Sequence, residues 1–203
     1  MISWSIKAAI DSNCFDKIIV STDDAEIAKI SKDCGAEIPF LRPDYLSDDH
    51  ATTSEVIAHA AQWANHQHSE FKNICCIYAT APFITTESIQ KGLVAVTPAT
   101  VNFSFAATTY PHPIQRAIKI TKYDGVTMFF PENQSRRSQD LEEAWHDAAQ
   151  FYWGKTNSWL AKKSIFSPLS RVVKIPRYRA IDIDTEEDWI FAETMFKAAM
   201  TRN

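Results

Sequence analysis

The chain of 203 residues lacks several features that would each place it in a particular class of protein. No apolar run is long enough to span a bilayer, and the start, Met1-Ile2-Ser3-Trp4, lacks the basic segment and apolar block of a signal peptide. Positive charge is not in excess, since 21 Lys and Arg stand against 25 Asp and Glu. Nonspecific nucleic-acid binding depends on clustered Lys and Arg. We therefore expect neither a membrane nor a nucleic acid as a partner.

Cysteine is scarce, and its placement argues against a zinc site. The cysteines are Cys14, Cys34, Cys75 and Cys76, and none forms a C-x-x-C pair of the kind that binds zinc. Cys75 and Cys76 are adjacent within an apolar stretch. We expect buried free thiols, which persist in a reducing compartment, and hence a cytoplasmic location.

The composition is that of one globular domain covering residues 1–203, with 45% hydrophobic and 23% charged residues. Its first half alternates between strand and helix patterns. Strands are predicted at residues 17–20, 37–41 and 74–79, and helices at residues 2–11, after the capping residues 21–24, from Thr53, and from Thr85 or Thr86 to about Val96. This alternation predicts an α/β fold with a mostly parallel sheet and helices on both faces.

The middle of the chain changes character. Strands are predicted at residues 101–109, 115–121, 126–130 and 147–154, with a polar loop at 131–143. We interpret residues 101–150 as an antiparallel extension of the main sheet, which could serve as a lid or a dimer surface.

Two carboxylates near the C-terminus are the most informative feature. Asp182 and Asp184 alternate with Ile181 and Ile183, and residues i and i+2 of a strand point to the same face. Mg²⁺ would relieve the repulsion between them and complete its octahedron with water and phosphate oxygens. The pair predicts metal-assisted chemistry on a nucleotide phosphate. The same stretch also fits a helix start, because Thr185 or Asp184 is a good N-cap and acidic residues follow; the two interpretations are compatible.

Other polar residues follow predicted strands, where open α/β sheets bind ligands. Arg42 and Thr53 are candidates to contact a nucleotide, and Thr80 would face the same crevice; turn formation and helix capping are the alternative for these residues. Arg137 lies in a polar loop with the sequence RRSQD, whose guanidinium groups suit an anionic substrate, unless the loop is simply solvated. His146 could transfer a proton or make only a local hydrogen bond.

Together these segments resemble the cytidylyltransferases that activate nonulosonic acids. The resemblance runs the length of the chain and is carried by LRPDYLSDDHATTSEV (41–56), CCIYATAPF (75–83), RRSQDLEEAWHDAAQFYWG (136–154) and AIDIDTEED (180–188). The third stretch and Tyr78 are similar to the pseudaminic acid branch, whereas sialic acid enzymes typically carry Gln at the position of Tyr78.

The resemblance implies a Rossmann-like nucleotidyltransferase sheet and the reaction of CTP with an acidic nine-carbon sugar, pseudaminic acid, to give a CMP-sugar and pyrophosphate. It implies that Asp182 and Asp184 bind Mg²⁺ as the catalytic pair and that the enzyme is a homodimer. CTP would be contacted by Arg42, Thr53 and Thr80, and the sugar by Arg137, Gln139 and Asp147. A cation near the acceptor suits a sugar that carries its own carboxylate.

Two departures from the family pattern accompany this resemblance. The family begins with a strand and a phosphate-binding loop, whereas Met1 to Ile6 matches the helix after that loop, so we expect weak or no CTP turnover from the chain as written. Ala149 stands where the related branch usually has Gly, and its Cβ is expected to tighten the pocket. The alternatives are the same reaction on sialic or legionaminic acid, and a non-catalytic fragment that acts only in binding or oligomerisation.

Overall fold

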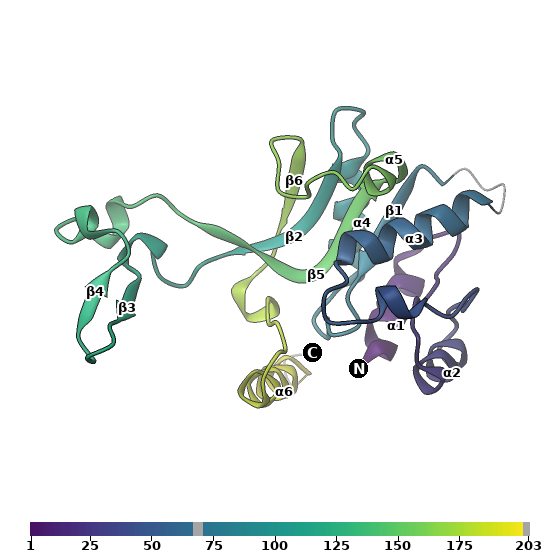
Figure 1. The fold of residues 1–203 in the computed structure, drawn as a ribbon, viewed down its shortest axis with the longest axis horizontal. Helices are drawn as coiled ribbons and strands as arrows, with labels where there is room; N and C mark the ends of the chain where they lie inside the picture. The colour runs from purple at the N-terminus through teal and green to yellow at the C-terminus, as the bar shows by residue number, and fades with distance from the viewer. Residues whose placement is uncertain (67–70, 201–203) are drawn as a thin grey trace.

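A computed structural model describes residues 1–66 and 71–200 of the chain, with side chains up to residue 198 (Figure 1). The described part consists of one four-stranded sheet, helices packed against it, and an arm that projects away from the sheet. None of the described helices is long and apolar enough to cross a membrane.

The helices predicted in the first half are confirmed. They are α1 (Ile2–Ser12), α2 (Ala25–Asp33), α3 (Thr53–His66) and α4 (Thr86–Val96). Their starts follow the capping residues in the sequence, because the side chain of Asp24 accepts a hydrogen bond from Ile27 N and that of Thr85 accepts one from Ser88 N.

The main sheet is mixed, so the prediction of a mostly parallel sheet is wrong in its pairing. Its strands are β1 (Asn73–Ile77), β2 (Phe103–Thr109), β5 (Trp145–Lys155) and β6 (Ser170–Lys174), in the order β1-β5-β2-β6. β5 is antiparallel to β1 and β2, and only β2 and β6 pair in parallel. The physical reason is that β5, predicted as part of the extension, inserts between two strands of the central sheet.

The predicted strands at residues 17–20 and 37–41 reduce to one parallel bridge between Ile19 and Glu37. Val20 N donates to Glu37 O, and Glu37 N donates to Ile18 O. A pocket lies between residues 17–22 and β1, and within the described residues β1 is an edge strand that pairs with β5. Segment 17–20 is therefore extended but has too few backbone partners to form a full strand.

Helices cover both faces of the sheet, as predicted, and each face has its own core. Alternate side chains of β5 divide between the faces. Phe151 and Trp153 pack with Ile89 of α4, whereas Tyr152 packs with Phe103 and Trp159. Trp159 belongs to α5 (Thr156–Leu160), which contacts α3 on that second face.

The strands predicted for the extension at 101–150 pair in antiparallel fashion, but β2 and β5 belong to the central sheet, and only the middle of the extension forms the projecting arm. The arm comprises residues 110–144 and contains a hairpin of β3 (Ile118–Ile120) and β4 (Val126–Met128). Short 3-10 helices lie at Ile114–Arg116, Pro131–Asn133 and Ser138–Asp140. A further 3-10 turn, Asp44–Leu46, precedes α3, and after β6 the chain passes through the 3-10 turn Arg177–Arg179 into α6 (Glu186–Met200). Residues 181–184 form no strand, which corrects the prediction for the carboxylate pair.

Candidate active site

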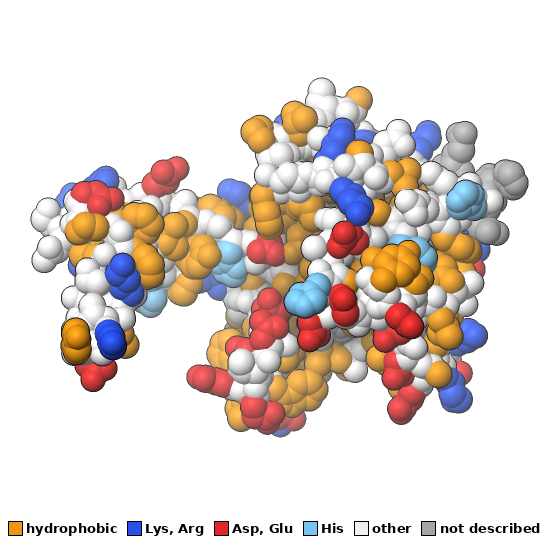
Figure 2. Space-filling model, viewed as in Figure 1, with side chains coloured by type: hydrophobic (Ala, Val, Ile, Leu, Met, Phe, Trp, Pro, Cys, Tyr) orange, Lys and Arg blue, Asp and Glu red, His pale blue; other side chains and the backbone are white. Residues whose placement is uncertain are grey.

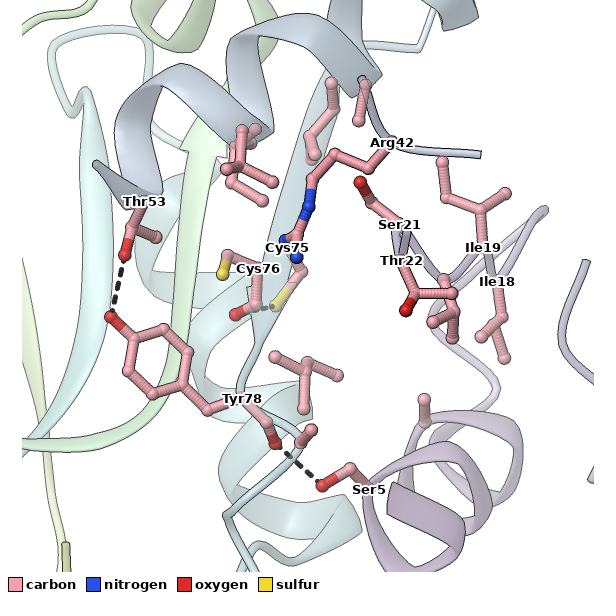
Figure 3. A pocket seen from close by; sticks show the side chains of 18 of the residues that line it. Ser5, Ile18, Ile19, Ser21, Thr22, Arg42, Thr53, Cys75, Cys76 and Tyr78 are labelled. Carbon is pink, nitrogen blue, oxygen red and sulfur yellow. Dashed lines mark hydrogen bonds between the residues drawn. The ribbon is translucent and has the colours of Figure 1, made fainter. Parts of the chain in front are cut away.

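A pocket of about 600 Å³ separates residues 17–22 from β1, and α1 and α3 border it (Figure 3). All three predicted nucleotide contacts, Arg42, Thr53 and Thr80, line this pocket. They reach it from three different elements, since Arg42 follows the bridge at Glu37, Thr53 begins α3, and Thr80 follows β1. The structure therefore brings together residues that lie up to 38 positions apart in the sequence.

Arg42 is held by both backbone and side-chain contacts. Its backbone N donates to Thr22 O at 2.8 Å, its Nη2 lies 3.0 Å from Asp23 Oδ1, and its Nε donates to Ser47 Oγ at 3.2 Å. The Arg42 side chain is three-quarters buried, and Figure 3 shows it extending into the pocket. A guanidinium fixed in this way presents a planar fork suited to phosphate or ribose oxygens.

Thr53 and Tyr78 join the start of α3 to the end of β1. Thr53 Oγ1 lies 3.1 Å from the Tyr78 hydroxyl, and Ser5 of α1 donates to Tyr78 O at 2.8 Å (Figure 3). Burial raises the pKa of Tyr78, although the hydrogen bond with Thr53 partly offsets that effect. Tyr78 thus stays a neutral hydroxyl on the wall of the pocket at physiological pH.

The pocket also has buried polar atoms without a hydrogen-bond partner in the described structure. Ser21 Oγ and Asn73 Oδ1 are both buried and unpaired, and both residues line the pocket. Unpaired buried polar atoms carry a free-energy cost that a polar ligand can remove. Neither residue was predicted to contact a ligand: Ser21 was assigned to a helix cap, and Asn is ordinary at the start of a strand.

The carboxylate pair precedes α6 directly. Asp182 and Asp184 are exposed, while Ile181 is buried against Phe83 and Ala192. Burial raises the pKa of Asp182, and the nearby charges of Asp184 and Asp147 raise it further. The helix cap is formed by other residues, since Asp188 N donates to Thr185 Oγ1 and Thr185 N donates to Asp188 Oδ2. The helix-start interpretation is therefore confirmed, and the metal-binding interpretation of Asp182 and Asp184 stays a prediction.

Arg179 holds the carboxylate segment beside the loop that follows β1. Its Nη2 donates to Thr85 Oγ1 at 2.8 Å and to Ser88 Oγ at 3.0 Å, and its Nε donates to Phe83 O at 3.1 Å. This loop also carries Thr80, which lines the pocket. Arg179, with Ile181 packed on Phe83, thus holds the carboxylate segment against the loop after β1, a role of Arg179 that sequence patterns did not reveal.

Asp147 lies in β5 and is linked to the pocket wall through Tyr152. The Tyr152 hydroxyl donates to Asp147 Oδ2, and the ring of Tyr152 lies 5.6 Å from that of Tyr78. His146 makes a local contact between its Nδ1 and Asp147 O, which fits the local alternative for that histidine. Tyr152 was not identified from the sequence, because it occupies an apolar strand where an aromatic residue is ordinary.

Arg137 and Gln139 lie on the projecting arm and do not line the pocket of their own chain. Arg137 is exposed and makes a two-point ion pair with Asp140, with Nε at 2.8 Å from Oδ2 and Nη2 at 3.2 Å from Oδ1. β2 and β5 carry the arm away from the sheet, which explains the separation. Within one chain, the pocket brings together the three candidate nucleotide contacts, whereas Asp147 and the carboxylate pair are not among the residues that line it.

No cluster of three or more His, Cys, Asp or Glu side chains suited to hold a metal is found among the described residues. Asp182 and Asp184 supply only two carboxylates. Two are sufficient for Mg²⁺, which commonly keeps several waters and binds substrate phosphates at its other positions.

Comparison with known proteins identifies the family. The model of the family described as "Cytidylyltransferase" matches residues 1–194. The chain is 38% identical over 197 residues to the pseudaminic acid cytidylyltransferase of Campylobacter jejuni, covering 97% of this chain and 85% of the relative. It is 24% identical over 196 residues to the N-acylneuraminate cytidylyltransferase of Escherichia coli, covering 96% of this chain and 45% of that relative.

The fold is also found in solved structures. A CMP:2-keto-3-deoxy-manno-octonic acid synthetase in complex with CTP matches 98% of this chain and 88% of its own, with a TM-score of 0.63 and 10% identity. That likeness concerns the fold alone. The family match and the relative from Campylobacter both extend over nearly the whole chain, and the pocket and carboxylate pair lie within it. The chain therefore belongs to the cytidylyltransferase family and is a nucleotidyltransferase of the CMP-nonulosonic acid synthetase type.

Proposed function

We propose that this enzyme transfers the cytidylyl group of CTP to pseudaminic acid, an acidic nine-carbon sugar, and releases pyrophosphate. The observation that carries this proposal is the 38% identity to a pseudaminic acid cytidylyltransferase over 97% of the chain. Tyr78 on the pocket wall supports the choice of sugar, because the resemblance to the pseudaminic acid branch includes this position.

The pocket between residues 17–22 and β1 is the proposed nucleotide site. Arg42 binds ribose or phosphate oxygens through its guanidinium, Thr53 contacts the base, and Thr80 lines the same space. The support is their convergence from three separate elements, together with the unpaired Ser21 Oγ and Asn73 Oδ1 nearby. A polar ligand would give these atoms the partners that the protein does not supply.

Asp182 and Asp184 are proposed to hold Mg²⁺. The two carboxylates are neighbours, and, besides burial, the charges of Asp184 and Asp147 both raise the pKa of Asp182. Such a concentration of negative charge fits a divalent cation. When bound, the metal would stabilise negative charge on the phosphate oxygens as the sugar hydroxyl attacks the α-phosphate. The protein contributes position, because Arg179 fixes this segment beside the loop that carries Thr80.

The acceptor sugar is proposed to contact Asp147 of one chain together with Arg137 and Gln139. Because those two residues lie on the arm, away from the pocket of their own chain, we propose a homodimer in which the arm reaches the partner. The arm carries exposed apolar side chains suited to such a contact (Figure 2): Ile114, Ile118, Ile120, Val126, Phe129 and Phe130. The free thiols support a reducing, cytoplasmic location for the enzyme.

A panel of acceptor sugars tests the proposed substrate. The chain is incubated with CTP and Mg²⁺ and with pseudaminic, legionaminic or sialic acid in turn, and pyrophosphate release is measured at high enzyme concentration. We expect the ratio kcat/KM to be largest for pseudaminic acid. A larger value for sialic or legionaminic acid would replace the proposed substrate, and calorimetry that shows no CTP binding would favour a non-catalytic fragment.

Substitution of Arg42 tests the nucleotide site. Loss of a charged hydrogen bond costs about 1.5–3 kcal/mol, so we expect Arg42→Met to weaken CTP binding by about tenfold to a hundredfold. Arg42→Lys keeps the charge but loses the planar fork, and we expect an intermediate effect. Isothermal titration with CTP gives the measurement, and Lys29→Met, on the exposed surface of α2, is the matched control. Unchanged affinity in Arg42→Met would remove Arg42 from the site.

A further inference from the structure

An irregularity in β5 brings two residues together that a regular strand would keep apart. Residues five positions apart in a strand point to opposite faces and are separated by roughly 16 Å. In this strand the Tyr152 hydroxyl nevertheless donates to Asp147 Oδ2. The pairing with β2 shows how, because Phe105 faces Tyr152 while Ala107 faces Asp147, so two steps on β2 correspond to five on β5.

The shift in register requires an unusual backbone at Ala149. Its φ of 47° lies in the left-handed region, which a residue with a Cβ seldom adopts. Bulges of this kind often redirect a side chain near a functional site. The consequence of this one is the contact between Tyr152 and Asp147.

The Asp147 carboxylate lies at the junction of the two halves of the site. On one side, Tyr152 packs against Tyr78, whose hydroxyl contacts Thr53 in the nucleotide pocket. On the other side, Gln150 of the same strand donates through Nε2 to the backbone O of Arg179, three residues before Asp182, so β5 contacts the segment that leads to the carboxylate pair. The acceptor hydroxyl must enter between the nucleotide and the metal-binding pair, which is the same region.

Tyr152 itself is suited to fix the carboxylate and unsuited to bind substrate. It is 5% exposed, and its ring is enclosed by Phe105, Tyr78 and the neighbouring core. Burial and the Asp147 charge both raise the pKa of Tyr152, so its hydroxyl keeps its proton and acts as a donor. One oxygen of Asp147 is thereby occupied, and Oδ1 keeps lone pairs that can accept a hydrogen bond from a ligand.

We propose that Tyr152 is a positioning residue that orients Asp147, so that the free carboxylate oxygen accepts a hydrogen bond from a hydroxyl or amide N–H of the acceptor sugar. This inference rests on the proposed function and deepens it, because it assigns a specificity role to a buried side chain that does not touch substrate. Asp147 is then the residue in contact with the sugar, and Tyr152 acts through it.

A double-mutant cycle tests this arrangement in the full chain. KM for the acidic sugar, KM for CTP, and kcat are measured for the wild type, Tyr152→Phe, Asp147→Ala and the double variant. We expect Tyr152→Phe to raise KM for the sugar by about tenfold while KM for CTP changes by less than about twofold. In the Asp147→Ala background, Tyr152→Phe should have no further effect on the sugar.

The controls separate positioning from general damage to the fold. Tyr123→Phe removes a hydroxyl from an exposed tyrosine at the hairpin turn and should leave all three constants unchanged. A purely structural role for Tyr152 would make its effect persist in the Asp147→Ala background and raise both KM values, which would overturn the inference. A Tyr152→Phe variant with the wild-type kcat and an unchanged KM for the sugar would overturn this inference but would leave the proposed function in place. A wild-type chain that joins CTP to no acidic sugar and shows no CTP binding by calorimetry would overturn both the inference and the proposed function.

Discussion

The helix cap and the candidate metal pair near the C-terminus use different side chains. The capping box at the start of α6 uses Thr185 and Asp188, so capping does not depend on the Asp182 and Asp184 carboxylates. The residue types were enough to predict the cap, and the metal role of the pair stays a prediction. Tyr152 and Arg179 could not be predicted in the same way, because their roles come from contacts 5 to 96 residues away in the sequence.

The Cys76 thiol provides a prediction at the residue scale. Burial raises its pKa from the ordinary 9.0 to about 12, so the folded state holds this proton more tightly than the unfolded chain does. The resulting stabilisation is complete below pH 9 and is lost as the pH rises toward 12.

Urea unfolding of the wild type and Cys76→Ala at pH 7, 9 and 10 measures this effect. We expect the stability advantage of the wild type to shrink above pH 9, by at most about 1.4 kcal/mol per pH unit. Cys34→Ala, at the C-terminal end of α2, is the control. A difference between wild type and Cys76→Ala that stays constant with pH would contradict the account.

Secondary-structure elements with strong local signals were predictable, and those fixed by long-range pairing were not. The starts of α2 and α4 follow from Asp24 and Thr85, which cap through short-range hydrogen bonds. The position of β5 between β1 and β2 depends on strand order, which the local pattern does not contain. β6 was missed because only Val173 in it is buried, so it lacks a clear apolar pattern.

The bulge in β5 leads to a prediction at the scale of the element. The left-handed backbone at Ala149 destabilises the fold by roughly 1–2 kcal/mol, because the residue has a Cβ, whereas Gly adopts this region freely. Gly also increases the entropy of the unfolded chain, which offsets part of the gain. We expect Ala149→Gly to stabilise the fold by about 0.5–1 kcal/mol.

Thermal unfolding measures this change, and the melting temperature should rise by about 1–4 °C in a chain of this size. The neighbouring Ala148→Gly is the matched control, because Ala148 is buried and its φ is not positive. Ala148→Gly should lower the melting temperature. Destabilisation by both variants would show that the left-handed backbone at residue 149 carries no strain.

At the scale of the whole molecule, the arm separates the candidate sugar contacts Arg137 and Gln139 from the pocket. The sequence predicted the antiparallel extension, because its short strands and turn residues are local signals. It could not show how far the extension stands from the sheet. That separation makes an assembly of two chains part of the proposed function.

Substitutions on the apolar surface of the arm test the proposed homodimer. Ile120 and Val126 pair across the hairpin and are 74% and 65% exposed. Burying this surface in a dimer would be favourable, and a lysine on it would not be tolerated. We expect sedimentation to show a dimer for the wild type and a monomer for Ile120→Lys combined with Val126→Lys.

Val94→Lys is the control, since Val94 is 73% exposed on α4, outside the arm. It should remain dimeric. A wild-type monomer at concentrations where CTP is turned over would contradict the proposed assembly, as would a dimer that persists in the double lysine variant.

The most direct test of the account is the dependence of cytidylyl transfer on the carboxylate pair. CMP-sugar formation is measured with CTP, Mg²⁺ and pseudaminic acid for the wild type, Asp182→Asn, Asp184→Asn and the double variant, with Glu187→Gln in the first turn of α6 as control. We predict a loss of at least about a hundredfold in kcat for each pair variant, because charge stabilisation on the phosphate is lost, and an unchanged rate for Glu187→Gln. A double variant that transfers the nucleotide at the wild-type rate would contradict the assignment of Asp182 and Asp184 to magnesium and catalysis.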